Sequence, residues 1–447
     1  MGVGARPKIK TRFMLQQRFD KHFYYDTEIL KNVSSEYFDE LLDRLKKHED
    51  YNNLKDKFDF NEKDKTIVYI IDKIPLDEIR DLSEEEMFFY PLCNKDEIKR
   101  IFNPQTANDY LLKLRAENIA DDIRLHRLYV TIRKKHENWN FSKYIDSTLF
   151  DDYLSRIYKK IKNQCNDIPH GIVHLTEPNG FCEKTPYGNI IVISEALKFF
   201  LYYMNLFALG RQLGIDESDV DAAFWIAIRI LLGFESLDFE IDSRGEIPED
   251  IDRIIKNSTE WQLRFIIGHE YAHHSLGHLD NGLLKRIEIN SNPALENSIT
   301  YYSHEHHLEY EADFHSIKSA KNKEFRNNLA IGAFYFFHFL DLFETVKSNL
   351  YPKSSFQIDS HPSALNRLWK LKESLNDEVG IKKKDLIEYL DSFNAFKEDI
   401  INTFYQGIKD RPQTTFGNVK ADVIADKEPA FVRGNFCSII RGSQWPA

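Results

Sequence analysis

The sequence predicts an α+β fold that is predominantly helical, with a small sheet in the second half and a helical N-terminal domain. Three observations lead to this prediction. Apolar residues recur at helical spacing over most of the chain. Short β-branched runs at 172–177 and 190–194 are typical of strands. The hydrophobic share of 42% and the aromatic share of 13% supply side chains for substantial cores, which argues against a disordered chain.

The first 165 residues are charged and mostly helical in pattern. Segments 36–54 and 107–136 place their apolar residues on one helical face. The β-branched run 64–72 predicts a single strand. This part contains no catalytic signature. We therefore interpret 1–165 as a helical accessory or regulatory domain.

The pattern changes near Ile168, where a second domain is expected to begin. Strands 172–177 and 190–194 flank a turn-rich segment, and a loop is expected at 243–252. The expected helices are 195–213, 217–234, 258–279 with Ser258 or Thr259 as N-cap, 306–321, 325–347, 361–375 and 383–408. These elements place the second domain at 166–380, followed by a C-terminal helix and tail at 381–447.

Composition excludes several classes of partner. The net charge of −11 and the pI of about 5.8 argue against a general nucleic-acid-binding surface. The longest apolar runs, 199–210 and 327–340, are shorter than the roughly 20 residues that span a bilayer. The four cysteines include no CxxC pair, as expected in a reducing compartment. We expect a cytoplasmic protein with no membrane and no nucleic-acid partner; its oligomeric state is left open.

One motif carries recognisable chemistry, the HExxH sequence His269-Glu270-Tyr271-Ala272-His273 within the expected helix 258–279. Residues four apart lie on one helical face, so both imidazoles can bind the same metal ion. Glu270 is next to the first ligand and can take a proton from a water molecule activated by the metal. The motif predicts a Zn²⁺ cofactor with His269 and His273 as ligands and Glu270 as the catalytic base.

A third ligand is expected in the segment EYEAD, residues 309–313. Glu309 can complete a His/His/Glu site that leaves a position open for water. We favour Glu309 over Glu311, which lies on a different helical face. Asp313 follows Glu309 by one turn and can hydrogen-bond a ligating imidazole.

The residues just after HExxH exclude the HExxHxxGxxH pattern of the metzincins, because Leu276 and Leu279 occupy its last two positions. His278 lies a little over one helical turn beyond His273. We expect its ring to point away from the metal, as a capping or packing histidine.

With this order of motifs, the chain resembles the gluzincins. It is most similar to the family of the CAAX-prenyl endopeptidase and the HtpX heat-shock protease with their soluble relatives, and more loosely to the phage-exclusion protease Lit. The matching elements lie within 170–375 and are Asn179-Gly180-Phe181, the strand IIVIS, HExxH followed by SLGH, ExEAD, and His361-Pro362 with Arg367. The resemblance implies a zincin-like catalytic domain with a small sheet and an HExxH active-site helix. The membrane helices of the best-known members have no counterpart in this sequence.

The resemblance also implies roles for residues outside the metal ligands. His361 is implied either to donate a hydrogen bond to the developing oxyanion or to make a structural hydrogen bond at a helix start. Arg367 is implied to be a structural ion-pair partner. The strand of Ile190, Ile191, Val192 and Ile193 is implied to be an exposed edge that binds an extended substrate, with an internal core strand as the open alternative.

The function expected from these features is zinc-dependent hydrolysis of peptide bonds in an intracellular protein or peptide substrate, as an endopeptidase. Two alternatives stay open. The first is a catalytically silent zinc-binding interaction or sensor protein. The second is an autoinhibited protease effector, such as a toxin or a phage-defence protein, in which the N-terminal domain or the tail 411–447 covers the cleft.

Overall fold

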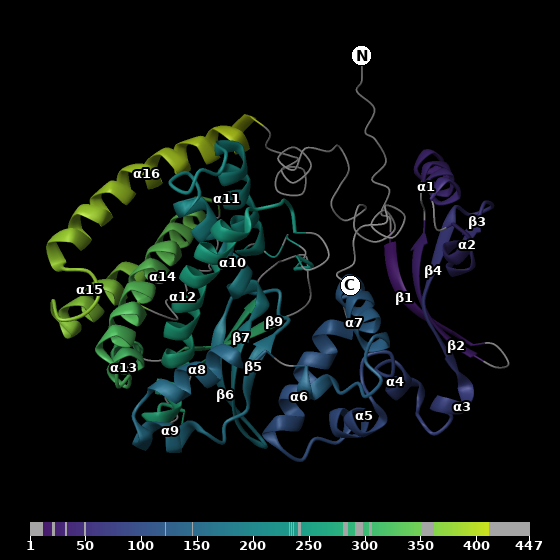
Figure 1. Ribbon diagram of the computed structural model, residues 1–447, viewed down its shortest axis with the longest axis horizontal. Coiled ribbons are helices and arrows are strands. Elements are labelled where there is room, and N and C mark those ends of the chain that lie inside the picture. Colours follow the sequence, from purple (N-terminus) through teal and green to yellow (C-terminus); the bar gives the residue numbers. More distant parts are fainter. Residues whose placement is uncertain are drawn as a thin grey trace.

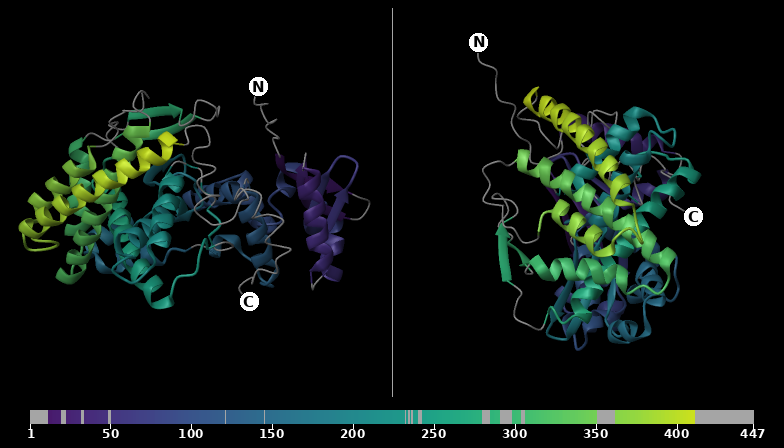
Figure 2. Two further views of the ribbon diagram at one scale, coloured as in Figure 1. Left: turned by 90° about the horizontal axis from the view of Figure 1, so that it is seen from above. Right: turned by 90° about the vertical axis from the view of Figure 1, so that its left-hand side faces the viewer.

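The computed structural model of the chain describes residues 12–19, 23–31, 34–48, 51–120, 122–144, 146–231, 243–279, 285–290, 298–303, 306–350 and 362–410, together with residues 233, 235 and 237–239. This part of the protein is mostly helical and contains small sheets, as predicted. Figure 1 shows an N-terminal sheet at one end of the molecule and the long helices of the C-terminal half at the other. The view from above in Figure 2 shows the same separation.

The N-terminal end contains a four-stranded antiparallel sheet in the order β1-β2-β4-β3. Its strands are β1 (Arg12–Phe19), β2 (Phe23–Lys31), β3 (Phe58–Asn61) and β4 (Thr66–Pro75). The expected strand 64–72 is confirmed as β4. The N-terminal domain was predicted to be helical, and β1, β2 and β3 were not predicted. They are held by main-chain hydrogen bonds to neighbouring strands, which side-chain periodicity reports only weakly.

Helices follow this sheet and share a hydrophobic core with it. Phe38, Ile67, Ile98 and Leu125 are buried in that core and come from helix, strand, helix and helix in turn. The expected helix 107–136 is divided into two. The helices of this region are α1 (Ser35–Lys47), α2 (Tyr51–Leu54), α3 (Leu76–Ile79), α4 (Glu84–Met87), α5 (Lys95–Phe102), α6 (Ala107–Ala120) and α7 (Ile123–Lys134).

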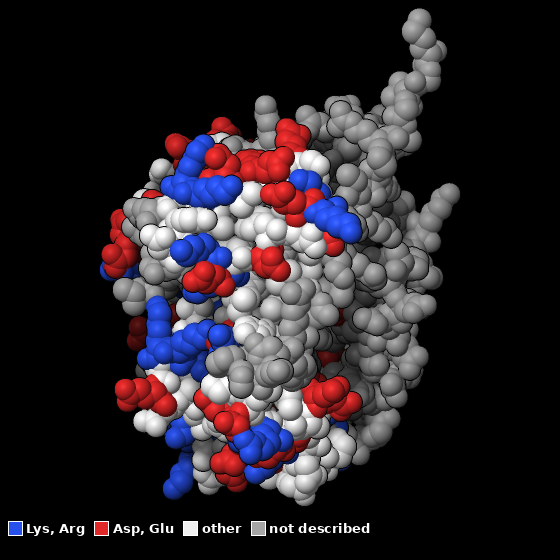
Figure 3. All heavy atoms as spheres, turned by 90° about the vertical axis from the view of Figure 1, so that its right-hand side faces the viewer, with Lys and Arg blue, Asp and Glu red and all other residues white. Residues whose placement is uncertain are grey.

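Figure 3 shows the N-terminal end face-on. On the described part of this face, Lys and Arg side chains lie among Asp and Glu side chains. On the first helix of this end, Arg44 pairs with Glu40 at 2.5 Å, and Lys47 pairs with Asp43 at 2.6 Å. Charges that alternate over such short distances largely cancel at longer range. The described residues of this face therefore do not form a broad basic area.

The second half contains a three-stranded sheet that carries the expected strand IIVIS at its centre. The order is β5-β7-β6, with β7 (Gly188–Ser194) parallel to β5 (His170–Val173) and antiparallel to β6 (Gly180–Thr185). Alternate β7 side chains enter two cores, Ile191 and Ile193 on one face and Ile190 and Val192 on the other. The prediction that this strand is an exposed edge is wrong, because both of its sides are hydrogen-bonded and both of its faces are covered.

Helix α12 (Glu249–Ser275) passes through the main hydrophobic core and carries HExxH. It starts earlier than expected, within the segment predicted as a loop. Three acidic residues in its first turn favour a helix start there, since negative charge is stabilised at a helix N-terminus. Ser258 and Thr259 are not caps. Their hydroxyls donate to the carbonyls of Ile254 and Ile255 inside the helix.

Helices that precede and follow α12 in the sequence pack against it, and so do β6 and β7 (Figure 1). Residues of α8 and α9 precede position 166 yet contribute buried side chains to the core of α12. The predicted domain boundaries stay predictions. The remaining elements are α8 (Thr148–Arg156), α9 (Lys159–Cys165), α10 (Glu195–Leu209), α11 (Glu217–Leu231), the hairpin β8 (Lys285–Asn290) and β9 (Ser298–Ser303), α13 (His306–Lys318), α14 (Lys323–Leu350), α15 (Ala364–Leu375) and α16 (Lys383–Asp410).

Within the described residues, one helix is long and apolar enough to cross a membrane, the segment Lys323–Val346 of α14. Of its apolar window, 56% is buried inside the fold. Phe334, Phe337 and Phe339 contribute to the main core. Core helices and membrane spans share this length and composition, and the packing of α14 is that of a core helix.

An ionic group around the buried His174 links the central sheet to the N-terminal helices. His174 follows β5 and contacts Glu195 at the start of α10 (Nδ1 to Oε2, 2.6 Å) and Asp122 before α7 (Nε2 to Oδ2, 3.8 Å). Burial alone would lower the pKa of His174, but these two carboxylates outweigh it and raise the pKa to about 9. The same contacts lower the pKa of Glu195 and Asp122 despite their burial.

We expect the free energy of unfolding to decrease as the pH rises from 6.5 to about 9, by on the order of 3 kcal/mol from His174. The folded state holds the His174 proton more tightly than the unfolded state. Its stabilising effect is therefore complete below the unfolded pKa and is lost as the pH passes the folded pKa. Urea denaturation across this pH range measures the effect. A His174→Gln variant should lose this part of the slope, and an unchanged slope in that variant would contradict the assignment.

Candidate metal centre

Helix α12 places the two HExxH histidines side by side. The Nε2 atoms of His269 and His273 are 2.9 Å apart, and both side chains are buried. The helix is held closely against α8 at Gly268. A Cβ atom there would lie 2.6 Å from the ring of Tyr153, whose hydroxyl donates to the carbonyl of Ser316 on α13. Tyr153 thus joins the HExxH helix to the helix that carries the third predicted ligand.

Helix α13 brings Glu309 to the two histidines. Its Oε2 lies 3.5 Å from His269 Nε2, and its Oε1 lies 3.5 Å from His273 Nε2. One ligand atom from each of the three buried residues lies within 4.8 Å of the others, so this group can hold a metal ion. Two imidazole nitrogens and one carboxylate oxygen are a donor set that suits zinc and leaves a position open. The three predicted ligands are brought together, and the identity of the metal stays a proposal.

Asp313 and Arg367 contact the predicted ligands through hydrogen bonds and ion pairs. Asp313 Oδ1 lies 2.9 Å from His269 Nδ1, the nitrogen that faces away from the other ligands. Arg367 contacts both oxygens of Asp313, Nη2 to Oδ1 at 2.6 Å and Nε to Oδ2 at 2.9 Å. Its Nη1 lies 3.2 Å from Glu309 Oε2. Asp313 occupies the position predicted for it, and Arg367 is an ion-pair partner as the resemblance implied.

The charges in this buried group shift its protonation equilibria. Burial alone would lower the pKa of His269, but hydrogen bonds to Asp313 and Glu309 raise it to about 10. Burial would likewise lower the pKa of Arg367, and the charges of Asp313 and Glu309 raise it. A metal ion bound through Nε2 of His269 would compete with protonation of that nitrogen.

Glu270 is buried next to the first strand residue of β6. A Cβ atom at Gly180 would lie 3.6 Å from Glu270 Oε1 and only 2.8 Å from Ile266 Cγ2. A glycine at this position lets the strand approach α12 closely. Among the described residues, β6 pairs only with β7, so its other side is the free edge of this sheet. Sequence reasoning missed β6 because it begins with Gly180 and is flanked by Asn and Pro residues, which are typical of turns.

His278 contacts the metal group without joining it. Its Nδ1 lies 3.0 Å from His273 Nδ1, and its Nε2 lies 3.4 Å from Glu311 Oε2. The ring therefore faces away from the ligand atoms of His273, as predicted. Glu311, the rejected alternative to Glu309, is directed at His278 and not at the ligand group.

His361, for which two roles were left open, lies outside the described residues. The predicted substrate-binding strand does not join the site. Ile190, Ile191, Val192 and Ile193 are buried at the centre of the sheet, so they cannot form main-chain hydrogen bonds with a substrate.

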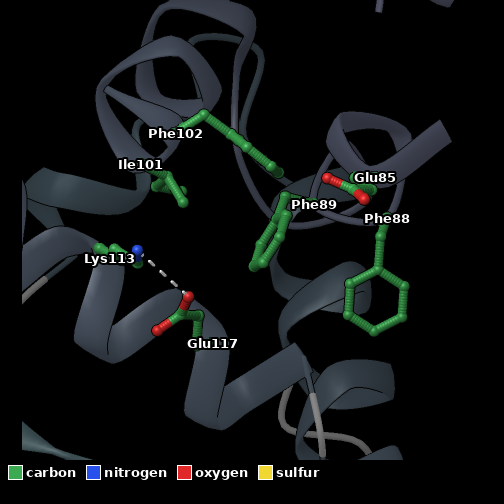
Figure 4. A pocket seen from close by; sticks show the side chains of 7 residues that line it. All are labelled: Glu85, Phe88, Phe89, Ile101, Phe102, Lys113 and Glu117. Carbon is green, nitrogen blue, oxygen red and sulfur yellow. Dashed lines mark ion pairs between the residues drawn. The ribbon is translucent and has the colours of Figure 1, made fainter. Parts of the chain in front are cut away.

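A cavity of about 360 Å³ lies on other elements, between α4, α5 and α6 (Figure 4). It is lined mainly by the rings of Phe88, Phe89 and Phe102. The Lys113 ammonium in its wall pairs with Glu117 at 3.8 Å. No histidine or cysteine lines the cavity, and it shares no residue with the metal group.

Comparisons of the chain with protein families, with curated proteins and with solved structures find no match.

Proposed function

We propose that this protein is a zinc-dependent endopeptidase with a zincin-like catalytic domain. The observation that carries the proposal is the buried convergence of His269, His273 and Glu309, with Glu270 beside the first ligand on the same helix. A purely structural metal site has no need of an acidic residue at position 270. The edge strand beside Glu270 is a second supporting feature.

Each group of residues has its own role in the proposed reaction. A zinc ion held by His269, His273 and Glu309 would supply the Lewis acidity that polarises a peptide carbonyl. Glu270 takes the proton of the attacking water and later delivers it to the leaving amine. The Asp313–Arg367 pair fixes the orientation of His269 through its Nδ1 atom.

An extended peptide would pair with the free edge of β6. Its main chain would continue the ladder that β7 begins, and Gly180 would bring this ladder next to the carboxylate of Glu270. This arrangement replaces the role that the sequence assigned to β7. Because main-chain pairing is largely independent of side chains, it suits the cleavage of unfolded or extended segments.

The ligand set is tested by elemental analysis of protein purified without chelators. We expect zinc to be bound in equimolar amount by the wild-type chain and by Glu311→Ala, and to be lost from Glu309→Ala. Glu311 contacts His278 and not the ligand group, so its alanine variant tests the rejected ligand at saturating zinc, and His306→Ala, at an exposed residue of the same helix, is the neutral control. Absence of zinc uptake by the wild-type chain would remove the basis of the proposal. Retention by Glu309→Ala with loss from Glu311→Ala would reassign the third ligand.

A further inference from the structure

The turn after α12 directs His278 back onto the metal-binding helix. Leu276 is the C-cap, and Gly277 follows in the left-handed conformation with φ of +74°. The amide of Gly277 donates to the carbonyl of His274, and the amide of His278 donates to the carbonyl of His273. These two bonds form a Schellman motif, which reverses the chain at a helix end and normally requires glycine at this position.

The reversal places the side chains of His273, His278 and Glu311 in a row that runs from the metal group to the surface. His278 is buried, and its ring lies 5.1 Å from that of His273 at an angle of 69°. Its two nitrogens have separate partners, His273 Nδ1 at 3.0 Å and Glu311 Oε2 at 3.4 Å. The Glu311 side chain is 46% exposed. A histidine that only capped the helix would not need both ring nitrogens directed at these groups.

The positions of the hydrogens follow from the metal site. When His273 binds a metal through Nε2, its Nδ1 must carry the hydrogen and donate it. His278 must then accept through Nδ1 and carry its own hydrogen on Nε2. That hydrogen points to Glu311, whose carboxylate accepts it. The row has one consistent set of donors and acceptors.

We propose that His278 is a positioning residue that holds His273 in the orientation and tautomer needed to bind metal, and that Glu311 fixes His278 in turn. The inference rests on the proposed metal site. Under this proposal, the two ligating histidines are oriented by different kinds of partner. His269 is oriented directly by the buried Asp313–Arg367 pair, whereas His273 is oriented through a neutral imidazole whose own partner is at the surface.

The test compares zinc affinities of full-length variants, measured by competition with a chromogenic chelator. His278→Leu keeps much of the buried volume and removes the acceptor. We expect its zinc affinity to fall about 10- to 100-fold, the range typical for loss of a residue that orients a ligand. His278→Asn places a carbonyl oxygen where Nδ1 was, so we expect it to recover most of the affinity. Gly277→Ala strains the turn and should weaken zinc binding without altering any side chain of the row.

Thermal unfolding of the chelator-treated proteins shows whether each variant folds. His306→Ala, which removes an exposed histidine of α13, is the control and should bind zinc as the wild type does. Equal affinity of folded His278→Leu and wild type overturns the inference, and so does equal loss in the leucine and asparagine variants. If the leucine variant does not fold, the Asn and Gly277→Ala variants still decide. Failure of the wild type to bind zinc overturns the proposed function itself.

Discussion

Glu270→Gln is expected to lower the rate of peptide hydrolysis by about 10²- to 10⁴-fold, the range typical for loss of a general base. The amide has the same shape as the carboxylate but does not accept a proton. Because the side chain is buried beside Gly180, a substitution of equal size preserves the close approach of the strand to the helix. The zinc content should therefore equal that of the wild type.

The measurement pairs the cleavage of a peptide library, read by mass spectrometry, with elemental analysis of the same samples. Glu260→Gln is the matched control, since Glu260 is a partly exposed acidic residue of the same helix that pairs with Arg264 at 3.2 Å. We expect this control to cleave and to bind zinc normally. Full activity of Glu270→Gln would exclude Glu270 as the base. Zinc binding without cleavage in the wild-type chain would favour the sensor alternative.

The local parts of the site could be predicted from sequence because a helix fixes them. Residues four apart share a face, and this alone places His269 with His273 and Glu309 with Asp313. The contact between α12 and α13 depends on tertiary packing, which local periodicity does not determine. It was expected because Glu309 can complete a His/His/Glu site, with Glu311 as the less favoured carboxylate, and α12 and α13 do pack together.

The edge of the sheet could not be predicted in this way. Four consecutive β-branched residues indicate a strand, but whether it lies at an edge or at the centre depends on which segments pair with it. The strand that forms the edge, β6, contains the residues Asn, Gly and Pro at and around its ends and a charged pair, Glu183 and Lys184, within it. Such residues are typical of turns and are also common on edge strands.

The contact between His278 and His273 could have been predicted from the glycine that precedes His278. A glycine just past the end of a helix indicates a chain reversal, and Gly277 stands two residues beyond Ser275. A reversal at that point returns the next side chain toward the last turn of the helix. Helical periodicity continued past Ser275 leaves His278 outside the ligand group, which agrees with the structure, but only the capping rule indicates its contact with His273.

Arg367→Leu is expected to destabilise the metal-free protein by about 3–5 kcal/mol, the cost of leaving buried charges without their counter-ion. Arg367 is the ion-pair partner of two buried carboxylates, Asp313 and Glu309, and its guanidinium also stacks on the ring of Phe337 at 4.9 Å. Its removal leaves those carboxylates close to each other in a medium where their repulsion is strong. Arg367→Lys should recover little, because an ammonium group does not make the paired contacts to both oxygens of Asp313.

The loss should depend on the metal. A divalent cation at His269, His273 and Glu309 places positive charge beside the same carboxylates, so it offsets part of the missing guanidinium charge. Urea denaturation with and without chelator measures this dependence, and the gap between the two curves should be larger for Arg367→Leu than for the wild type. Arg253→Leu, which removes an exposed partner of Glu249 on α12, should change stability by no more than about 1 kcal/mol in either condition. An equal gap in Arg367→Leu and wild type would mean that the guanidinium and the metal stabilise the fold independently. In that case Arg367 supports the packing of α13 and α15 and does not balance the charge of the metal site.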